Sequence, residues 1–168
     1  IAFADFINGR SPELEAAPTT PDDACFWLYS SGSTGQPKGA IHLQHDMVYC
    51  SKAFGEHIVG IREEDVSFAA AKLFVAYGLG NGLYYPFSVG GTAVYMPVRP
   101  TPASVFETIR RHKPTLFYGV PTLYGTMLQE EGGMDGVRLC ISAGEALPAD
   151  KIGRAAGRER GEIDVVGA

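Results

Sequence analysis

The chain has 168 residues, of which 45% are apolar and 20% are charged, and its 14 Lys and Arg against 19 Asp and Glu give a formal net charge of −5. This composition is typical of a globular protein and argues against an intrinsically disordered chain. The mild acidity argues against nucleic acid as the main partner, because binding to a phosphate backbone normally shows as clustered positive charge. The length fits one domain or part of a larger one. The first residue is Ile1 rather than Met and the last four form an apolar run, so we expect a piece cut at both ends.

The cysteines and the hydropathy of the chain indicate its cellular location. Cys25, Cys50 and Cys140 lie far apart without a CxxC spacing, which supports neither a disulfide framework nor a zinc site and favours a reducing, cytoplasmic location. Residues 73–98 carry no Asp, Glu, Lys or Arg, and this uncharged run is long enough for a membrane span of about 20 residues. Glycines and Pro86 interrupt this run, so a buried, glycine-rich interior segment is the favoured interpretation. We therefore expect no membrane partner, and the oligomeric state stays open.

The first elements surround a Ser/Gly cluster. Residues 8–23 are polar, contain three prolines and predict a surface connection. Residues 24–29 form a short apolar and aromatic run that predicts a buried strand. Residues 40–43 predict a second short strand, and apolar positions at helical spacing predict a helix over 44–58.

The second half of the chain alternates strands with helices. Strands are predicted at 66–71 and 92–96 with a buried helix over 78–87 between them, and a helix begins at Thr101, an N-cap hydroxyl followed by proline, and stops before Pro114. A strand at 115–118, a helix at 121–130 and a strand at 137–142 follow. This order predicts an α/β fold of layered, largely parallel sheets flanked by helices.

The most informative stretch is YSSGSTGQPKG, residues 29–39. Glycines let backbone N–H groups turn toward an anion, hydroxyls add donors, and Lys38 supplies a positive charge, so a phosphate-binding loop is plausible. Composition alone leaves a flexible surface linker as an equal alternative. The GxxxxGK[ST] pattern of P-loop ATPases is not matched, because Gly39 follows Lys38.

This string resembles the phosphate-loop signature of the adenylate-forming superfamily, which includes acyl- and aryl-CoA synthetases, luciferases and adenylation domains of peptide synthetases. Residues 142–148 (SAGEALP) resemble the adenine-binding turn of that superfamily, and 118–122 (YGVPT) resemble the strand-to-helix turn beside its acyl pocket. Residues 72–82 (KLFVAYGLGNG) are most similar to benzoate-CoA ligases and their hydroxybenzoate relatives. The resemblance covers 24–148.

The resemblance implies that residues 1–168 are part of the large N-terminal AMP-binding domain of such an enzyme. After the Leu-Pro of the adenine-binding turn, family members continue with an amphipathic helix, a strand and a turn that ends in Thr-Glu. Residues 151–160 instead have a poor apolar face and two glycines, and no Thr-Glu follows. The ribose-binding aspartate and the C-terminal lid domain with its lysine are also absent from the sequence.

The resemblance also implies roles for single residues. Lys38 and Thr34 would be the catalytic groups of a loop around the β- and γ-phosphates of ATP. The full loop set is Ser30, Ser31, Gly32, Ser33, Thr34, Gly35 and Lys38. The adenine would lie along Gly144, Glu145 and Ala146, for which an ordinary strand-end turn is the alternative.

The carboxylic acid would bind at residues from two other segments. Ala76 and Tyr77 would line its pocket, since a small residue beside an aromatic one leaves room for a flat ring. Gly119, Val120 and Pro121 would bound the same pocket. Without the resemblance, Tyr77 would be interpreted as a core aromatic and the Gly119 segment as a loop before a helix.

The implied activity is ATP-dependent conversion of benzoate or a hydroxybenzoate to its acyl-adenylate and then to the aryl-CoA thioester, with ATP, Mg²⁺ and coenzyme A. No protein metal ligand is assigned, and His42 and His45, which lack the HExxH spacing, are expected at surface or N-terminal helix positions. We expect the 168 residues alone to have negligible activity. The alternatives are another adenylate-forming enzyme, acting on fatty or amino acids, a nucleotide-binding module without catalysis, or a piece that does not fold alone.

Overall fold

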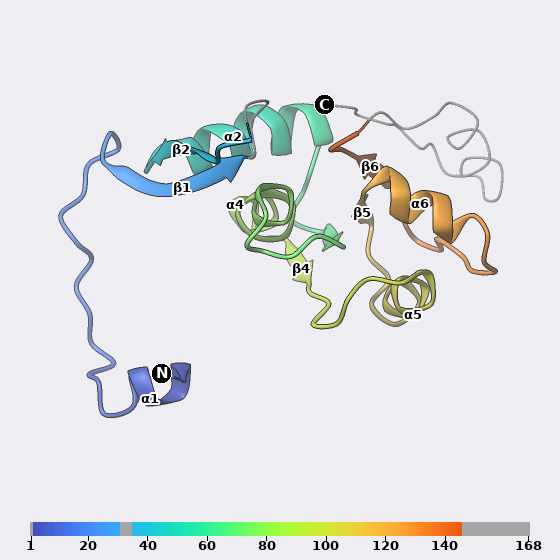
Figure 1. Cartoon of the computed structure of the whole chain (residues 1–168), viewed down its shortest axis with the longest axis horizontal. Coiled ribbons are helices and arrows are strands. Elements are labelled where there is room, and N and C mark those ends of the chain that lie inside the picture. The colour runs from blue at the N-terminus through green and yellow to red at the C-terminus, as the bar shows by residue number, and fades with distance from the viewer. Residues whose placement is uncertain (1, 31–34, 146–168) are drawn as a thin grey trace.

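The computed structural model describes residues 2–30 and 35–145. Its centre is a four-stranded, entirely parallel sheet in the order β4-β3-β5-β6 (Figure 1). The strands are β3 (Val66–Ala69), β4 (Thr92–Val94), β5 (Leu116–Gly119) and β6 (Leu139–Ser142). Two further strands, β1 (Ala24–Ser30) and β2 (Lys38–Leu43), form a separate antiparallel hairpin. The predicted α/β architecture with largely parallel pairing is confirmed.

Eight helical segments accompany the strands in the described residues. They are α1 (Phe3–Ile7), α2 (Asp46–Cys50), η1 (Ser51–Val59), α3 (Ala76–Leu79), η2 (Gly80–Tyr84), α4 (Tyr85–Ser88), α5 (Pro102–His112) and α6 (Pro121–Met127), of which η1 and η2 are π-helical. Because α2 continues into η1, the helix predicted over 44–58 is present, and α3, η2 and α4 together match the one predicted over 78–87.

The strands alternate side chains between two apolar layers, as their period of two requires. On one face, Phe68, Val94, Phe117 and Cys140 pack with Val105 and Ile109 of α5 and with Leu123 and Met127 of α6. On the other face, Ala69, Leu116, Tyr118 and Ile141 pack with residues of η1, α3 and α4, among them Val59, Tyr77 and Tyr85. The sheet is therefore the middle of three layers, which is the packing expected of parallel strands.

Helix α5 shows why the local sequence signals were reliable. The hydroxyl of Thr101 accepts from the backbone N–H of Ser104, and Pro102 occupies the first turn, where no backbone donor is needed. The helix ends at His112, and the next residue, Lys113, has a left-handed φ of 50° just before the buried Pro114. Both ends lie where the sequence predicts them.

The strand order places a switch of direction between β3 and β5. From β3 the chain crosses to β4 on one side, and it then returns to place β5 on the other side of β3, with β6 beyond it. In open parallel sheets, ligands bind outside the carboxyl ends of the strands at such a point. The topology therefore directs attention to the segments that follow β3 and β5.

Two expectations about burial require correction. The strand at 24–29 exists but is not buried, since Trp27 is 53% and Tyr29 74% exposed. Within the described residues β1 pairs with β2 alone, and α2 packs against only part of this two-stranded ribbon, so most of its side chains stay exposed. The uncharged segment is only partly interior, because Gly80 and Gly82 are buried whereas Phe74 is 86% exposed.

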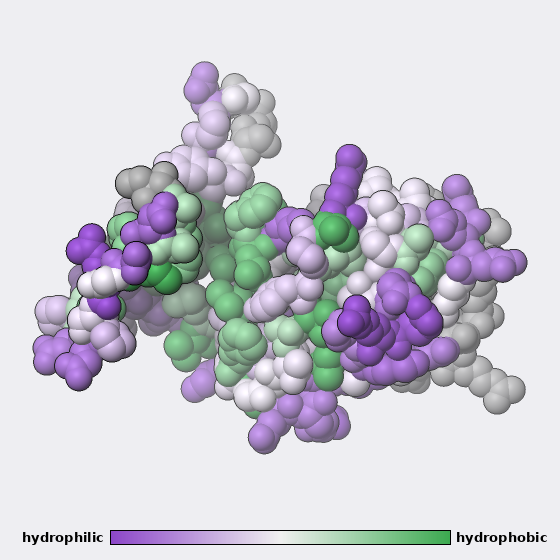
Figure 2. Space-filling view, turned by 90° about the horizontal axis from the view of Figure 1, so that it is seen from below, coloured by the Kyte–Doolittle hydropathy of each residue, from purple (hydrophilic) through white to green (hydrophobic). Residues whose placement is uncertain are grey.

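Several features of the chain lie outside the central sheet. Residues 8–23 contain no helix or strand and are exposed, as expected of a connection, and they lead away from the sheet to α1, which the sequence analysis did not anticipate (Figure 1). Apolar side chains gather on part of the surface viewed in Figure 2. No helix in the described part of the chain is both long enough and apolar enough to cross a bilayer.

Candidate functional site

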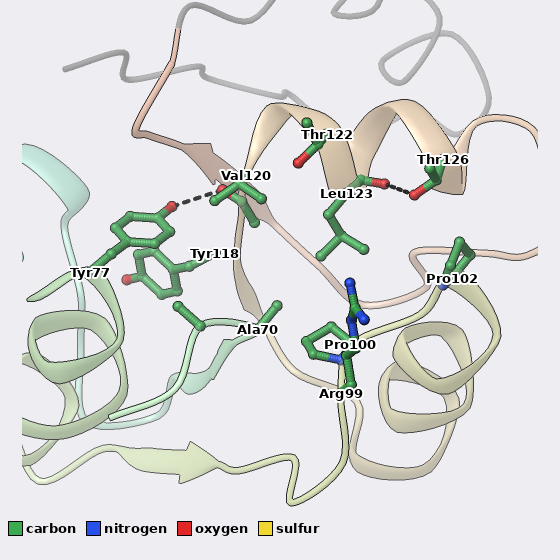
Figure 3. Close-up of a pocket in the computed structure, with 12 residues that line it drawn as sticks. Ala70, Tyr77, Arg99, Pro100, Pro102, Tyr118, Val120, Thr122, Leu123 and Thr126 are labelled. Atoms are coloured by element: carbon green, nitrogen blue, oxygen red, sulfur yellow. Dashed lines mark hydrogen bonds between the residues drawn. The ribbon is translucent and has the colours of Figure 1, made fainter. Parts of the chain in front are cut away.

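A cavity of about 330 Å³ lies at the carboxyl ends of β3 and β5, where the topology switches direction (Figure 3). This volume is at the lower end of the range of about 300–1,000 Å³ found for small-molecule sites. The residues that line it are Ala70, Ala71, Tyr77, Arg99, Pro100, Pro102, Tyr118, Gly119, Val120, Thr122, Leu123 and Thr126. Most of these side chains are apolar, so the cavity suits a small ligand with an apolar body.

Tyr77 forms one wall and connects three elements. Its hydroxyl donates to the carbonyl oxygens of Gly119 at 3.2 Å and Ile141 at 3.0 Å, which joins α3 to the ends of β5 and β6. Its ring meets that of Tyr118 edge-on, with 6.4 Å between ring centroids. Burial raises the pKa of Tyr77, so its hydroxyl keeps its proton at neutral pH and remains a donor. The ring is thereby fixed in one orientation.

Gly119 provides close packing at the end of β5. A Cβ atom at this position would lie 2.8 Å from the ring of Tyr124, whose hydroxyl donates to the carbonyl oxygen of Ile141 at 3.0 Å. Any side chain would therefore displace a buried aromatic residue. Val120 follows on the cavity wall, and the buried Pro121 begins α6 behind it.

Of the five predicted acid-binding residues, the structure brings Tyr77, Gly119 and Val120 together around the cavity. Ala76 is exposed at the first turn of α3, and Pro121 is buried in α6; neither is among the lining residues. The position of α3 depends on glycine, because a Cβ atom at Gly78 would overlap the carbonyl oxygen of Lys72.

The hairpin brings together the two ends of the predicted phosphate loop. Ser30 and Lys38 are direct partners in the β1–β2 register, and both are exposed. Gly35 has a φ of 76°, a conformation that favours glycine. Ser31, Gly32, Ser33 and Thr34 lie outside the described residues. The lysine and the first serine thus stand side by side at one end of a two-stranded ribbon.

The predicted adenine turn follows β6. Gly144 has a φ of 95° and is exposed together with Glu145, whereas Ala146 lies outside the described residues. Directly before this turn, Ser142 is buried, and its hydroxyl has no hydrogen-bond partner within residues 2–30 and 35–145. A buried hydroxyl without a partner is costly, and Ser142 shares this property with Ser67 and Tyr118 of the same sheet.

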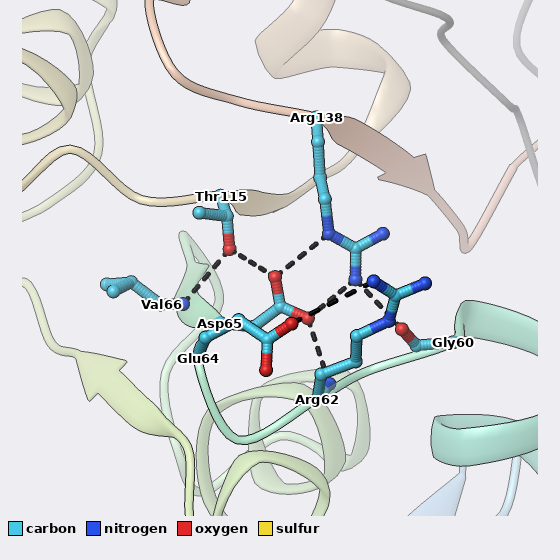
Figure 4. A network of polar contacts seen from close by, with 7 residues as sticks. All are labelled: Gly60, Arg62, Glu64, Asp65, Val66, Thr115 and Arg138. Carbon is cyan, nitrogen blue, oxygen red and sulfur yellow. Dashed lines mark hydrogen bonds and ion pairs between the residues drawn. The ribbon is translucent and has the colours of Figure 1, made fainter.

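Sequence reasoning missed a polar network at the opposite, amino end of the sheet (Figure 4). Asp65, only 3% exposed, accepts from Arg138 Nε at 2.9 Å, from Arg138 Nη2 at 2.6 Å and from the hydroxyl of Thr115 at 2.6 Å. It also accepts from the backbone N–H of Arg62 at 2.9 Å. Burial raises the pKa of Asp65, but these donors outweigh it and hold the pKa below its usual value. No signal in the sequence connects Asp65 with Arg138, which is 73 positions away.

His42 and His45 make contacts between the hairpin, the segment before it and α2. The ring of His42 stacks on Phe26, and its Nδ1 lies 3.1 Å from Asp46, while His45 Nδ1 donates to the carbonyl oxygen of Pro21. Asp46 also accepts from the backbone N–H of Leu43, which is the main reason that its pKa is lowered. These contacts hold α2 against the hairpin. No group of three or more His, Cys, Asp or Glu residues in the described ranges is placed to hold a metal ion.

Comparison with known proteins gives a consistent set of relatives. A sequence model of the family described as AMP-binding enzyme matches residues 4–166. A benzoate–CoA ligase of Thauera aromatica is 60% identical over 158 residues, which cover 91% of this chain and 30% of the relative. A 4-hydroxybenzoate–CoA/benzoate–CoA ligase of Rhodopseudomonas palustris is 51% identical over 138 residues, covering 79% of this chain and 25% of that protein.

Solved structures agree with the sequence relatives. A benzoate CoA ligase from Burkholderia xenovorans superposes with a TM-score of 0.88 at 43% identity, covering 99% of this chain and 34% of the other. An anthranilate CoA ligase in complex with anthranoyl-AMP superposes with a TM-score of 0.92 at 37% identity, covering 99% and 33%. The chain thus spans about a third or less of the length of each of these proteins.

Proposed function

Because the chain belongs to the AMP-binding enzyme family, we propose that the protein carrying it activates an aromatic carboxylic acid with ATP and transfers the acyl group to coenzyme A. The proposed acid is benzoate or a hydroxybenzoate, and the reaction would serve the degradation of aromatic compounds in the cytoplasm. Residues 1–168 would form part of the large N-terminal AMP-binding domain. The observation that carries the proposal is 60% identity over 91% of this chain to a benzoate–CoA ligase.

The lining of the cavity supports a flat aromatic substrate. Ala70 and Ala71 leave space at the end of β3, Leu123 adds an apolar surface from α6, and the rings of Tyr77 and Tyr118 offer aromatic contacts. A planar ring gains from such surroundings by losing contact with water and by edge-on aromatic packing. Tyr77 and Gly119, with Val120, are the proposed binding residues, and Ala76 and Pro121 would support them from outside the cavity.

The proposed chemistry has two balanced steps. A carboxylate oxygen of the acid forms a bond to the α-phosphorus of ATP while the bond from that phosphorus to pyrophosphate breaks. The sulfur of coenzyme A then bonds to the acyl carbon, AMP leaves, and the thiol proton is released. Neither step needs a nucleophilic side chain.

The loop that begins at Ser30 and ends at Lys38 would stabilise the departing pyrophosphate. Lys38 supplies a cation, and Thr34 with the other hydroxyls and backbone N–H groups of the loop would add donors. The pairing of Ser30 with Lys38 holds the two ends of the loop together before ATP arrives. Gly144, Glu145 and Ala146 would border the adenine, where the absence of a side chain at Gly144 permits close approach.

Mg²⁺ would enter bound to the phosphates of ATP, because this ion is commonly held by substrate phosphates with only one or two carboxylates. When bound, it neutralises charge that develops on the leaving pyrophosphate.

Acid-dependent pyrophosphate release tests the proposal, measured with ATP and Mg²⁺ on protein expressed from the complete gene. The substrates to compare are benzoate, hydroxybenzoates, aminobenzoate, cinnamate, fatty acids and amino acids. Preference for benzoate-type rings is the expected result. Preference for fatty or amino acids would contradict the aryl assignment, and no release with any acid would favour a nucleotide-binding module, which a thermal melt with ATP would then detect.

A lysine substitution tests the loop separately from the acid pocket. The Lys38→Met variant is expected to lower kcat by about 10²- to 10³-fold, as removal of a charge-stabilising donor does in other enzymes. Lys52→Met is a matched control, because Lys52 is an exposed lysine of η1, away from the loop. An equal loss in both variants would contradict the role of Lys38.

A further inference from the structure

One arginine lines the cavity, and no role has been assigned to it. Among the described lining residues, Arg99 is the only one with a charged side chain, and Figure 3 shows its guanidinium directed toward Leu123. Within the described parts of the chain it has no hydrogen bond or ion pair. Arg62, Arg110 and Arg138, in contrast, each pair with an acidic side chain. The guanidinium of Arg99 is therefore available to a ligand.

The backbone that carries Arg99 is held on both sides. The ammonium of Lys72 donates to the carbonyl oxygens of Met96 and Val98, both at 2.7 Å. On the other side Thr101 is fixed by its reciprocal hydrogen bonds with Ser104. Pro97, Pro100 and Pro102 further restrict the segment. Arg99 is thus presented from a preorganised support, which reduces the entropy lost when it binds a partner.

The position of Arg99 decides which part of a ligand it meets. It follows β4, whereas Gly144 and Glu145 follow β6, at the opposite edge of the sheet. These edges are three strand spacings apart, about 14 Å. If the nucleotide lies along Gly144, as the proposed function requires, a carboxylate at its α-phosphate is on the β6 side. The reacting carboxylate of a benzoyl group in that position would therefore lie too far from Arg99 to bind it.

We propose that Arg99 makes the β4 end of the cavity a subsite for an anionic oxygen group other than the reacting carboxylate. Arginine suits carboxylate and phosphate oxygens because its planar fork can donate two parallel hydrogen bonds. The group can come from a second acidic substituent on the ring of the acid or from a phosphate of coenzyme A. This inference rests on the proposed function and names a specificity determinant within the same site.

Arg99→Gln in the protein from the complete gene provides the test, because the two half-reactions separate the two sources. Pyrophosphate release without coenzyme A compares terephthalate, which has a second carboxylate, with benzoate. The complete reaction compares coenzyme A with pantetheine, which lacks the phosphates. If the ring substituent is the source, the variant is expected to raise the KM for terephthalate relative to benzoate by about fivefold, with little change in kcat. If the phosphates of coenzyme A are the source, the KM for coenzyme A relative to pantetheine is expected to rise by the same factor. High salt is expected to reduce the difference between variant and wild type.

Two further variants make the result specific. Arg99→Lys keeps the charge and is expected to restore most of the affinity, although not the fork geometry. Arg111→Gln is the matched control, an exposed arginine in the last turn of α5 that does not line the cavity. Unchanged KM ratios in Arg99→Gln, or equal changes in Arg111→Gln, would overturn the subsite. Wild-type protein without acid-dependent release would overturn the proposed function and the subsite with it.

The support from Lys72 is tested in the same assays. Lys72→Met removes both bonds to the 96–98 segment and is expected to raise the same KM ratio as Arg99→Gln. The double variant is expected to show no further increase, because Lys72 acts through the position of Arg99. Additive effects of the two substitutions would contradict this link.

Discussion

The two ends of the central sheet use polar side chains in opposite ways. At the amino end, Asp65 binds Arg138 and Thr115 directly, so the charged and hydroxyl groups satisfy one another. At the carboxyl end, the guanidinium of Arg99 and the buried hydroxyl of Ser142 have no partner within the described residues, and Arg99 lines an apolar cavity. Polar groups that are paired internally contribute to cohesion, whereas unpaired ones at a cavity are available to a ligand.

This difference follows from the parallel topology. The segments before β3, β5 and β6 come together at one edge, where Asp65, Thr115 and Arg138 each directly precede a strand. The segments after β3 and β5 diverge because the connection from β3 runs to β4 and that from β5 to β6. One edge is therefore closed by contacts between neighbouring loops, and the other is open at the switch point.

The largest effect is expected from Asp65→Asn, which leaves Arg138 without its anion. The substitution is expected to lower the free energy of unfolding by about 3 kcal/mol, the lower end of the range for broken buried pairs, because Arg138 is 40% exposed. Urea denaturation of the protein from the complete gene measures the change. The KM for the acid is expected to stay constant under folding conditions, since the network lies at the other end of the sheet. A raised KM with normal stability would contradict the separation of the two ends.

The pH dependence of the stability lost in Asp65→Asn is the control for this prediction. The pKa of Asp65 is lower in the folded protein than in the unfolded chain, so the carboxylate stabilises the fold above about pH 4. That contribution is lost as the pH falls through the folded pKa. The difference between wild type and Asp65→Asn is therefore expected to be greatest at neutral pH and to shrink below about pH 4. A difference that stays constant at low pH would point to a packing defect instead.

Thr115→Val is expected to have the next largest effect on stability. Its hydroxyl donates to Asp65 and accepts from the backbone N–H of Val66 at 3.0 Å, so the isosteric valine removes two bonds at once. A loss of about 2 kcal/mol is expected, because hydrogen bonds to charged groups are among the stronger ones. Urea denaturation beside Asp65→Asn measures it, and additive losses in the double variant would show that the two residues do not act as one network.

The sequence predicted what depends on local pattern. The order of strands and helices followed from apolar periodicity, and α5 was located by the Thr101 cap and by Val105 and Ile109, which share the buried face. The burial of the 24–29 strand was predicted wrongly, because apolar composition shows what gains from burial and not whether a covering layer is present. In the described residues Tyr29 lies in a two-stranded ribbon.

The candidate site was predictable only in part, and for a different reason. The resemblance placed Tyr77, Gly119 and Val120 in one pocket, and the structure brings these three together. Arg99 gave no signal, because a single arginine before a helix resembles any solvated surface residue. The link between Asp65 and Arg138 was also invisible, since contacts over 73 positions depend on strand order and register.

A smaller effect on stability, with a larger one on substrate binding, is expected from Tyr77→Phe. The variant keeps the ring but removes the donor to the carbonyl oxygens of Gly119 and Ile141. Unfolding is expected to become easier by about 1 kcal/mol, the typical value for a neutral hydrogen bond. The KM for the acid is expected to rise because the ring is no longer fixed against β5 and β6. Denaturation and steady-state pyrophosphate release measure the two effects, and an unchanged KM would show that the hydroxyl of Tyr77 is not needed to position the ring for the acid.

The smallest effect on stability is expected from Ser142→Ala, the carboxyl-end counterpart of Thr115→Val. Both substitutions delete one hydroxyl at an end of a parallel strand of the same sheet, but only that of Thr115 has partners within the described residues. Removing a buried hydroxyl that no other group satisfies avoids its desolvation cost, so the free energy of unfolding is expected to stay within about 0.5 kcal/mol of wild type or to rise. Urea denaturation of both variants under the same conditions gives the comparison directly. A loss from Ser142→Ala as large as that from Thr115→Val would mean that Ser142 is paired in the folded protein, and the contrast between the two ends would then rest on Arg99 alone.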